Sequence, residues 1–348
     1  MTATSPYRHP AWFGSVMGTG ALALALSAQA ATWGWAWANT LGQATLALAS
    51  GLALLLLPRY ATRLADGGGL RAELADPGHG AMLATLPAGL LVLAAGWGRI
   101  GPTLVPEQVA VWTAGVLLVA GVVLALAIGL GWSASMLRGT QGLEAVNGGW
   151  LIPPVMNLLV PLALAPLIVA IPTAAPLLVL IGFAFYGAGA ILFLAILTLL
   201  VARLALRDPM PAGMAASLWI PLAPAGVLGL ALLRLLQAAA EAGVSGLPSP
   251  SAAIPVAAMG IGFGLWWAAF AGWELRRIRR GGGVPVHPGW WGFVFPVAAM
   301  ALSITAVGAA TDVWLVEAVG LLATAALVVL WCYVAVRTIR MLGRTSRP

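Results

Sequence analysis

The sequence predicts an all-α integral membrane protein, with ten transmembrane helices arranged as five helical hairpins around a central pore. Composition supports the membrane assignment, because 61% of the 348 residues are hydrophobic and only 8% are charged. A soluble domain of this size exposes far more charge to water. The pattern of proline and glycine supports the layered arrangement. These residues interrupt the odd-numbered helices, which predicts an inner layer of kinked helices held by an outer layer of regular ones.

Ten segments in turn are apolar over about the 20 residues that a helix needs to cross the hydrocarbon core. Their approximate ranges are 11–31, 38–57, 80–97, 108–132, 151–170, 176–203, 216–238, 254–274, 290–309 and 314–336. The loops are short, so a single ten-span domain over residues 1–348 is expected. The sequence Ala-Gln-Ala at residues 28–30 also resembles a signal-peptide cleavage site, but losing the first span would place the termini on opposite sides.

Each odd-numbered span contains helix-breaking residues within two or three turns of its start. The predicted kinks are at Gly18 and Gly20, Pro87, Pro153, Pro154 and Pro161, Pro221 and Pro224, and Pro296. The even-numbered spans keep their prolines at or beyond their ends, at Pro58, Pro106, Pro176, Pro209 and Pro255. The odd spans begin about seventy residues apart, which favours a repeated hairpin over ten unrelated helices.

All seventeen basic residues are arginine, and their distribution predicts the orientation. Fifteen fall on the side of the termini, whereas Arg99 falls in a loop on the other side and Arg234 falls within the seventh span. The fifteen are Arg8, Arg59, Arg63, Arg71, Arg138, Arg203, Arg207, Arg276, Arg277, Arg279, Arg280, Arg337, Arg340, Arg344 and Arg347. The positive-inside rule therefore predicts a multi-pass protein of the cytoplasmic (inner) membrane with both termini in the cytoplasm. Anionic lipid head groups, not nucleic acids, are the expected partners of this charge.

The middle of the spans contains no Asp, Glu, Lys or His, and no nucleotide-binding, metal-binding or catalytic motif is present. Proton-coupled and cation-coupled carriers usually keep ionisable groups at this depth. Broken helices without acids instead favour anions, which half-helix N-termini attract. We therefore expect no cofactor, no metal and no enzymatic activity.

Seven polar residues of the odd spans are candidates to line the pore. They are Ser15, Thr19, Thr85, Asn157, Ser217, Ser303 and Thr305. The alternative for each is a bond to its own helix or to a neighbouring one. Arg234, ~26 Å along its helix from Ser217, is a candidate cation of an outer vestibule, and the alternative is that it extends outward near Glu241.

The segment 289–296, Gly-Trp-Trp-Gly-Phe-Val-Phe-Pro, is the most distinctive in the chain. A bulky aromatic residue directly before a kink proline can project toward the axis of the bundle. An aromatic side chain in a narrow apolar pore blocks it and promotes dewetting. The alternative is ordinary packing of an aromatic-rich helix, with Trp290 and Trp291 at the membrane interface.

Four segments together resemble the tellurite-resistance/dicarboxylate transporter family, which includes slow anion channels, malate permeases and sulfite pumps. They are residues 10–20, 150–155 and 220–226, and Trp290-Trp291 followed by Phe295-Pro296. The resemblance implies five hairpins, odd helices forming the pore, and a homotrimer with one pore per subunit. It also implies that Phe295 gates the pore, with Phe293 as the alternative.

The same resemblance implies the substrates and the mechanism. The family's substrates include chloride, nitrate, sulfite, tellurite and C4-dicarboxylates such as malate, and the residues do not choose among them. The main expectation is a channel, and a carrier-type exporter or uptake system is the alternative. A membrane-embedded enzyme or a sensor is a more distant alternative.

Overall fold

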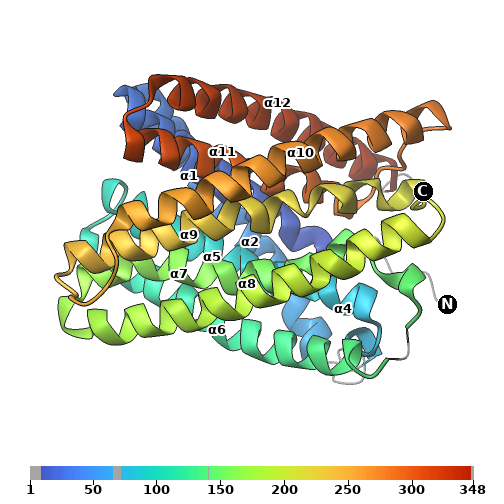
Figure 1. The fold of residues 1–348 in the computed structure, drawn as a ribbon, viewed down its shortest axis with the longest axis horizontal. Helices are drawn as coiled ribbons and strands as arrows, with labels where there is room; N and C mark the ends of the chain where they lie inside the picture. The colour runs from blue at the N-terminus through green and yellow to red at the C-terminus, as the bar shows by residue number, and fades with distance from the viewer. Residues whose placement is uncertain (1–8, 66–71, 140, 346–348) are drawn as a thin grey trace.

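The computed structural model describes residues 9–65, 72–139 and 141–345, and these ranges contain helices and loops without strands (Figure 1). Ten stretches are long and apolar enough to cross a membrane, which confirms the all-α, ten-span prediction. They are Pro10–Trp33, Ala36–Thr62, Gly80–Arg99, Glu107–Met136, Gly148–Ala170, Pro172–Leu206, Ala212–Glu241, Pro250–Arg280, Pro288–Thr311 and Trp314–Gly343. Arg8, Arg71 and Arg347, which entered the predicted orientation, lie outside the described residues.

The helices cover the greater part of each predicted span, and several outer helices continue past the predicted ends. Their bounds are α1 (Phe13–Trp33), α2 (Ala36–Ala65), α4 (Pro77–Leu83), α5 (Thr85–Arg99), α6 (Glu107–Met136), α7 (Ile152–Ala170), α8 (Ala175–Leu206), α9 (Leu222–Glu241), α10 (Ala253–Arg280), α11 (Val294–Thr311) and α12 (Trp314–Thr345). Short 3-10 segments cover Pro10–Trp12, Gly101–Thr103, Leu143–Ala145, Gly148–Leu151, Pro172–Ala174, Ala212–Trp219, Pro250–Ala252 and Pro288–Phe293.

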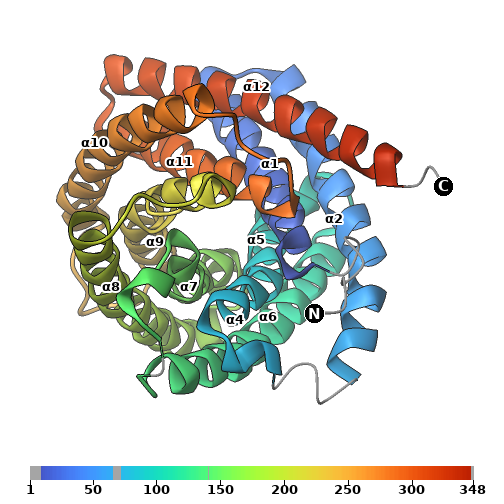
Figure 2. The same cartoon turned by 90° about the vertical axis from the view of Figure 1, so that its right-hand side faces the viewer.

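The helices form two concentric layers. The apolar windows of the odd spans are 72–89% buried, against 22–28% for the even spans, so the odd spans form the inner layer. Each inner helix packs on the outer helix that follows it in the chain: α1 on α2, α5 on α6, α7 on α8, α9 on α10 and α11 on α12. The inner helices also contact one another in the closed order α1, α5, α7, α9, α11 and α1 (Figure 2).

Both chain ends lie at the same end of this ring (Figure 1). We call this end the termini face and the opposite end the far face. Every inner helix starts at the termini face: α1 begins there, and each later inner span follows an outer helix that returns there. Among the described arginines, Arg99 and Arg234 lie toward the far face, in the last turn of α5 and within α9. Arg99 is thus helical, and the expectation that it lies in a loop was wrong.

The inner spans change helix type near their starts, and most of the predicted kink prolines lie at these junctions. A 3-10 segment precedes α1, α7, α9 and α11, and a break at Ala84 separates α4 from α5. Pro87, Pro153, Pro154, Pro224 and Pro296 each occupy the second or third position of an α-helix, and Pro221 is the residue before α9. The N–H group of a residue at those positions has no hydrogen-bond partner within the helix. Proline, which lacks this group, therefore costs the helix little stability there.

Prolines and glycines inside the helices behave differently. Pro161 lies within α7, where Pro166 is a second internal proline that the sequence analysis did not single out. Pro58 lies inside α2, which continues to Ala65, so the expectation that it ends its helix was wrong. The helix α1 is continuous through Gly18 and Gly20, because its change of helix type comes earlier, at Trp12.

Gly18 and Gly20 are explained by close packing of the inner helices. A Cβ atom at Gly18 would lie 2.9 Å from a methyl carbon of Val294 on α11, and one at Gly20 would lie 2.8 Å from a methyl carbon of Val92 on α5. Small residues let membrane helices approach each other in this way. These glycines therefore bring α1 against both of its neighbours in the ring.

Candidate functional site: a passage through the inner ring

Side chains of the five inner spans surround two cavities that follow one another along the ring. The termini-side cavity has a volume of about 440 Å³ and is bordered by the starts of all five spans, including His9, Thr85, Asn147, Ser217 and His287. The far-side cavity has a volume of about 80 Å³ and is bordered by the far halves of α1, α5, α7, α9 and α11. The two cavities together mark a passage through the ring, which we call the passage.

Each inner span presents a stripe of side chains to the passage, and the stripe of the third span is interrupted between Thr85 and Val92. On the seventh span the stripe runs Ile220, Ala223, Val227, Leu230 and Arg234, so successive members are three or four residues apart. This spacing keeps one face of a helix turned in one direction. The corresponding stripes are Ala11, Gly14, Met17, Ala21, Leu24 and Ala28; Thr85, Val92, Ala95 and Arg99; Ile152, Val155, Leu159 and Leu162; and Gly292, Phe295, Ala299 and Leu302.

Phe295 lies between the two cavities. Among the residues that the structure describes, it is the only one that borders both, and its side chain is 7% exposed. It occupies the second position of α11, directly after the 3-10 segment Pro288–Phe293, and Pro296 follows as the third. Phe295 thus lies where the two cavities approach each other, at the change of helix type.

Phe293 points elsewhere. Its ring packs edge-on against Trp219 at a centroid distance of 6.0 Å and against Trp290 at 5.9 Å. It borders neither cavity of the passage and instead borders a groove between α10 and α12. Two residues correspond to ~200° around a helix, which accounts for the opposite directions of Phe293 and Phe295.

The mouth of the termini-side cavity is ringed by capped helix starts. In four of the five inner spans an acceptor side chain binds the backbone N–H group two residues further on. The pairs are His9 with Ala11 at 3.1 Å, Asp76 with Gly78 at 2.8 Å, Asn147 with Gly149 at 2.8 Å, and His287 with Gly289 at 3.1 Å. The Nε2 atom of His287 also lies 2.8 Å from the carbonyl oxygen of Gly213, in the seventh span, which is the inner span without such a cap. These polar residues therefore hold the entrances of the inner helices in place.

The sequence carries a signal for these caps that was not used. An acceptor residue, then Pro or Gly, then Gly or Ala occurs at 9–11, 76–78, 147–149 and 287–289. Sequence reasoning missed Asp76 and Asn147 as residues of the site because it looked for polar groups at mid-membrane depth.

Two of the seven predicted pore-lining residues border the passage. Thr85 and Ser217 both face the termini-side cavity. The hydroxyl group of Thr85 donates to the carbonyl oxygens of Met82 at 2.8 Å and Pro10 at 3.0 Å. The hydroxyl group of Ser217 lies 3.9 Å from the sulfur of Met210. Ser217 thus has the weaker partner and the greater freedom to bind a solute.

The other five predicted residues border neither cavity: Ser15, Thr19, Asn157, Ser303 and Thr305. Ser15 and Asn157 donate to backbone carbonyl oxygens three and four residues back, at 2.7 and 2.9 Å. Thr19 accepts from the indole N–H group of Trp331 at 3.0 Å, and Thr305 accepts from Gln29 at 2.8 Å. Ser303 is buried and its oxygen has no hydrogen-bond partner among the described residues. Four of these side chains therefore connect helices or bond within them, as the alternative reading expects.

Two arginines face the far-side cavity. Arg99 and Arg234 both border it, and no carboxylate of the described residues lies within 4 Å of either guanidinium group. Arg234 is half-buried, and it donates a hydrogen bond to Gln237 at 3.0 Å on its own helix. Sequence reasoning identified Arg234 but missed Arg99, which terminates the α5 stripe. The passage therefore ends at the far face in unneutralised positive charge.

The remainder of the passage is apolar, and the described residues contain no group of three or more His, Cys, Asp or Glu side chains that could hold a metal ion. The starts of α7, α9 and α11 border the termini-side cavity through Ile152, Ala223 and Phe295. The positive ends of three helix dipoles thus point toward it. The arrangement can attract an anion at both ends of a narrow apolar segment.

Comparison with known proteins identifies the family. A family model described as voltage-dependent anion channel matches residues 7–339. The chain belongs to the voltage-dependent anion channel family. This match confirms the resemblance drawn from the sequence and makes the protein an anion channel or transporter.

The curated relatives are transporters as well. An uncharacterized transporter of Methanocaldococcus jannaschii is 28% identical over 84% of this chain and 82% of its own length. A second uncharacterized transporter of that organism is 32% identical over 46% of each chain. A sulfite efflux pump of Trichophyton rubrum is 28% identical over 50% of this chain and 48% of its own length.

Proposed function

We propose that this protein moves small inorganic or organic anions across the cytoplasmic membrane through the passage, with the Phe295 ring as its gate. The observation that supports the gate most directly is the position of Phe295 between the two cavities. An anion that passes the ring loses water on all sides in an apolar segment, and such dewetting closes a pore. Movement or removal of one side chain then opens it.

The charge distribution supports anions as the transported species. Arg99 and Arg234 at the far-side cavity raise the local concentration of anions, and the helix starts at the termini-side cavity favour them as well. Asp76 borders the mouth of the termini-side cavity, where its carboxylate accepts the N–H group of Gly78. That bond compensates part of its negative charge, so Asp76 does not reverse the preference for anions.

A carrier-type sulfite exporter is the second candidate, and the observation in its favour is the relative named as a sulfite efflux pump. Chloride, nitrate, tellurite and dicarboxylates such as malate are further candidate substrates of the same passage. We propose transport rather than an enzymatic reaction. In this proposal the termini face is cytoplasmic and the protein is a homotrimer with one passage in each subunit, as the family resemblance implies.

Anion flux in proteoliposomes that contain only the purified protein tests this function. Vesicles loaded with chloride, nitrate or sulfite should release the anion when an ionophore balances the charge, and Phe295→Ala should accelerate the release. Phe293→Ala is the matched control, because it removes the same ring from a side chain that faces away from the passage. The proposal would be refuted if vesicles with wild-type or Phe295→Ala protein released every anion no faster than vesicles without protein.

A further inference from the structure

A third cavity lies outside the ring, at the termini face, and none of its lining residues borders the passage. It has a volume of about 430 Å³ and lies between the end of α10, the segment 283–290 and α12. We call it the outer groove. Both α10 and α12 belong to the outer layer and pack on α11 (Figure 2). Its walls are apolar, from Leu275, Val286, Leu330 and Val334, and two arginines, Arg279 and Arg337, border it.

The depth of the outer groove matches the head-group region of a bilayer. Arg279 lies in the last turn of α10. Arg337 lies ~35 Å along α12 from Trp314 at ~1.5 Å per residue, which exceeds the ~30 Å hydrocarbon thickness. The surrounding outer surface is apolar, with Trp273 60% exposed and Val329 71% exposed. An exposed apolar surface at this depth suits contact with lipid.

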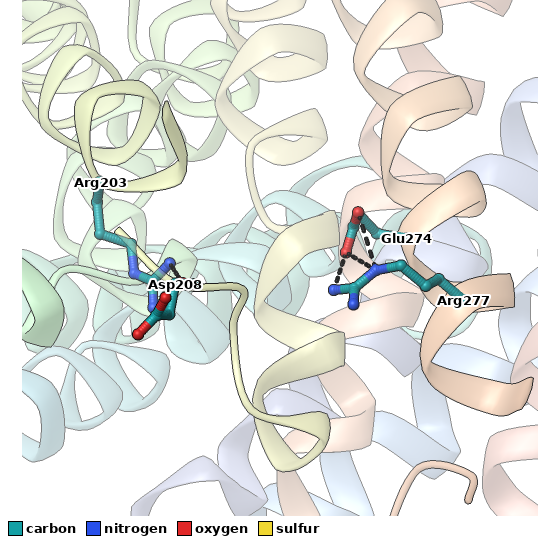
Figure 3. A network of polar contacts seen from close by, with 4 residues as sticks. All are labelled: Arg203, Asp208, Glu274 and Arg277. Carbon is teal, nitrogen blue, oxygen red and sulfur yellow. Dashed lines mark hydrogen bonds and ion pairs between the residues drawn. The ribbon is translucent and has the colours of Figure 1, made fainter. Parts of the chain in front are cut away.

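The two arginines of the groove carry uncompensated charge. No carboxylate of the described residues lies within 4 Å of Arg279 or Arg337. Arg277, by contrast, forms an ion pair with Glu274 at 2.7 Å (Figure 3). The guanidinium of Arg337 lies 5.2 Å from the ring centroid of Tyr333 and donates to its hydroxyl oxygen at 3.1 Å. That contact orients the planar group and leaves further N–H donors for an anionic ligand.

A column of aromatic rings leads from Arg337 to the start of α11. Tyr333 stacks on Trp290 at a centroid distance of 6.0 Å and an interplanar angle of 27°. Trp290 donates to the carbonyl oxygen of Pro285 at 2.8 Å and packs edge-on against Phe293, the residue before α11. Tryptophan and tyrosine favour the membrane interface, where one side of the ring is apolar and the other meets polar groups. Arg337, Tyr333 and Trp290 thus form one contiguous row along the groove.

We propose that the outer groove binds one anionic phospholipid. Its phosphate lies between Arg279 and Arg337, and an acyl chain follows Leu330 and Val334 along α12. The apolar wall requires a lipid tail, which a free phosphate ion lacks. The two positive charges favour phosphatidylglycerol, which has a net negative charge, over phosphatidylcholine, whose choline cation offsets the phosphate. This site is independent of the proposed gate and of the transported anion.

Native mass spectrometry of the delipidated protein in detergent tests the site. The probes are dioleoylphosphatidylglycerol, dioleoylphosphatidylcholine and soluble glycerol 3-phosphate. We expect tighter binding of one phosphatidylglycerol per chain, and about fivefold weaker binding for each of Arg279→Gln and Arg337→Gln. The matched controls are Arg276→Gln and Arg340→Gln, which remove exposed arginines of the same two helices that do not border the groove.

Three results would overturn the proposal. The first is a lack of specificity, seen as equal binding of the two phospholipids or as equal losses of phosphatidylglycerol binding in the groove and control variants. The second is binding of glycerol 3-phosphate as tight as that of the phospholipid, which would indicate a site for a soluble anion. The third is a change of oligomer mass in the groove variants, which would indicate that a second copy of the chain covers the groove. Leu330→Trp fills the groove without changing charge and should also weaken phosphatidylglycerol binding, so unfolding of an arginine variant does not remove the test.

Discussion

Truncation of Phe295 to alanine should convert the passage into a continuous water-filled path. The phenyl ring borders cavities of about 440 Å³ and about 80 Å³. At ~30 Å³ per water molecule, these have room for ~15 and ~2–3 molecules. Removal of the ring joins them, so an anion keeps part of its hydration across the constriction.

The size of the effect follows from the hydration that is restored. A hydrogen bond to a charged group contributes ~1.5–3 kcal/mol. One such bond, regained at the narrowest point, lowers the barrier by that amount, and each ~1.36 kcal/mol is a factor of ten in rate. We therefore expect Phe295→Ala to raise basal anion conductance by ~10- to 150-fold. The loss of stability should be smaller than for a packed core residue, because cavities already border the ring on two sides.

Single-channel and macroscopic currents in planar bilayers, in symmetrical chloride and at equal protein density, measure this effect. Phe293→Ala should leave the conductance within about twofold of the wild type, since its ring contacts Trp219 and Trp290 away from the passage. An open Phe293→Ala variant beside a closed Phe295→Ala variant would show that the wrong aromatic residue has been assigned. If both variants fold and neither conducts more than the wild type, α11 does not carry the gate.

Three further predictions concern charge, capping and packing. Arg234→Gln should lower the conductance about threefold at 10 mM salt and little at 1 M, because a charge ~7 Å from the anion contributes ~0.6 kcal/mol in water and salt screens it. Arg340→Gln, at the termini face, is the control. A loss of conductance that is equal at all salt concentrations would indicate that Arg234 has a packing role. His287→Ala removes the contacts with Gly289 and Gly213, which should cost ~1–2 kcal/mol and lower the Tm, and an unchanged Tm would contradict the capping role. Gly226→Val should abolish the folded-protein peak in detergent gel filtration, since a Cβ atom there would lie 2.7 Å from the backbone of Ala299. Gly262→Val is the control, because the space around Gly262 is open. Equal yields of the two variants would contradict the packing argument.

Hydropathy predicted the ten spans well because each helix must satisfy its backbone within the bilayer, and the structure confirms them. The helix ends were less predictable. The second span was expected to stop before Pro58, yet α2 continues to Ala65, because a proline on an outer helix interrupts the hydrogen bonding without ending the helix. Gly18 was assigned a kink from its residue type, whereas its contact with Val294 requires knowledge of the packed ring.

Phe295 and Arg234, both candidates of the sequence analysis, border the passage. Phe295 was named from the family resemblance and its place before Pro296, and Arg234 from its charge within a span. Arg99 was missed because it was assigned to a loop, although its spacing of four residues from Ala95 fits the same stripe. Five of the seven candidate polar residues border neither cavity, because residue type does not reveal which face of a helix meets the centre of a ring. The stripes depend on helix rotation, which only packing determines.

The reversal potential in a salt gradient tests the central claim most directly. Purified wild-type and Phe295→Ala protein would be measured in planar bilayers with a tenfold gradient of potassium chloride. Selectivity for anions predicts a reversal potential near the chloride equilibrium value, ~59 mV in magnitude for one charge. A reversal potential at the potassium equilibrium value would contradict an anion passage through this ring of helices.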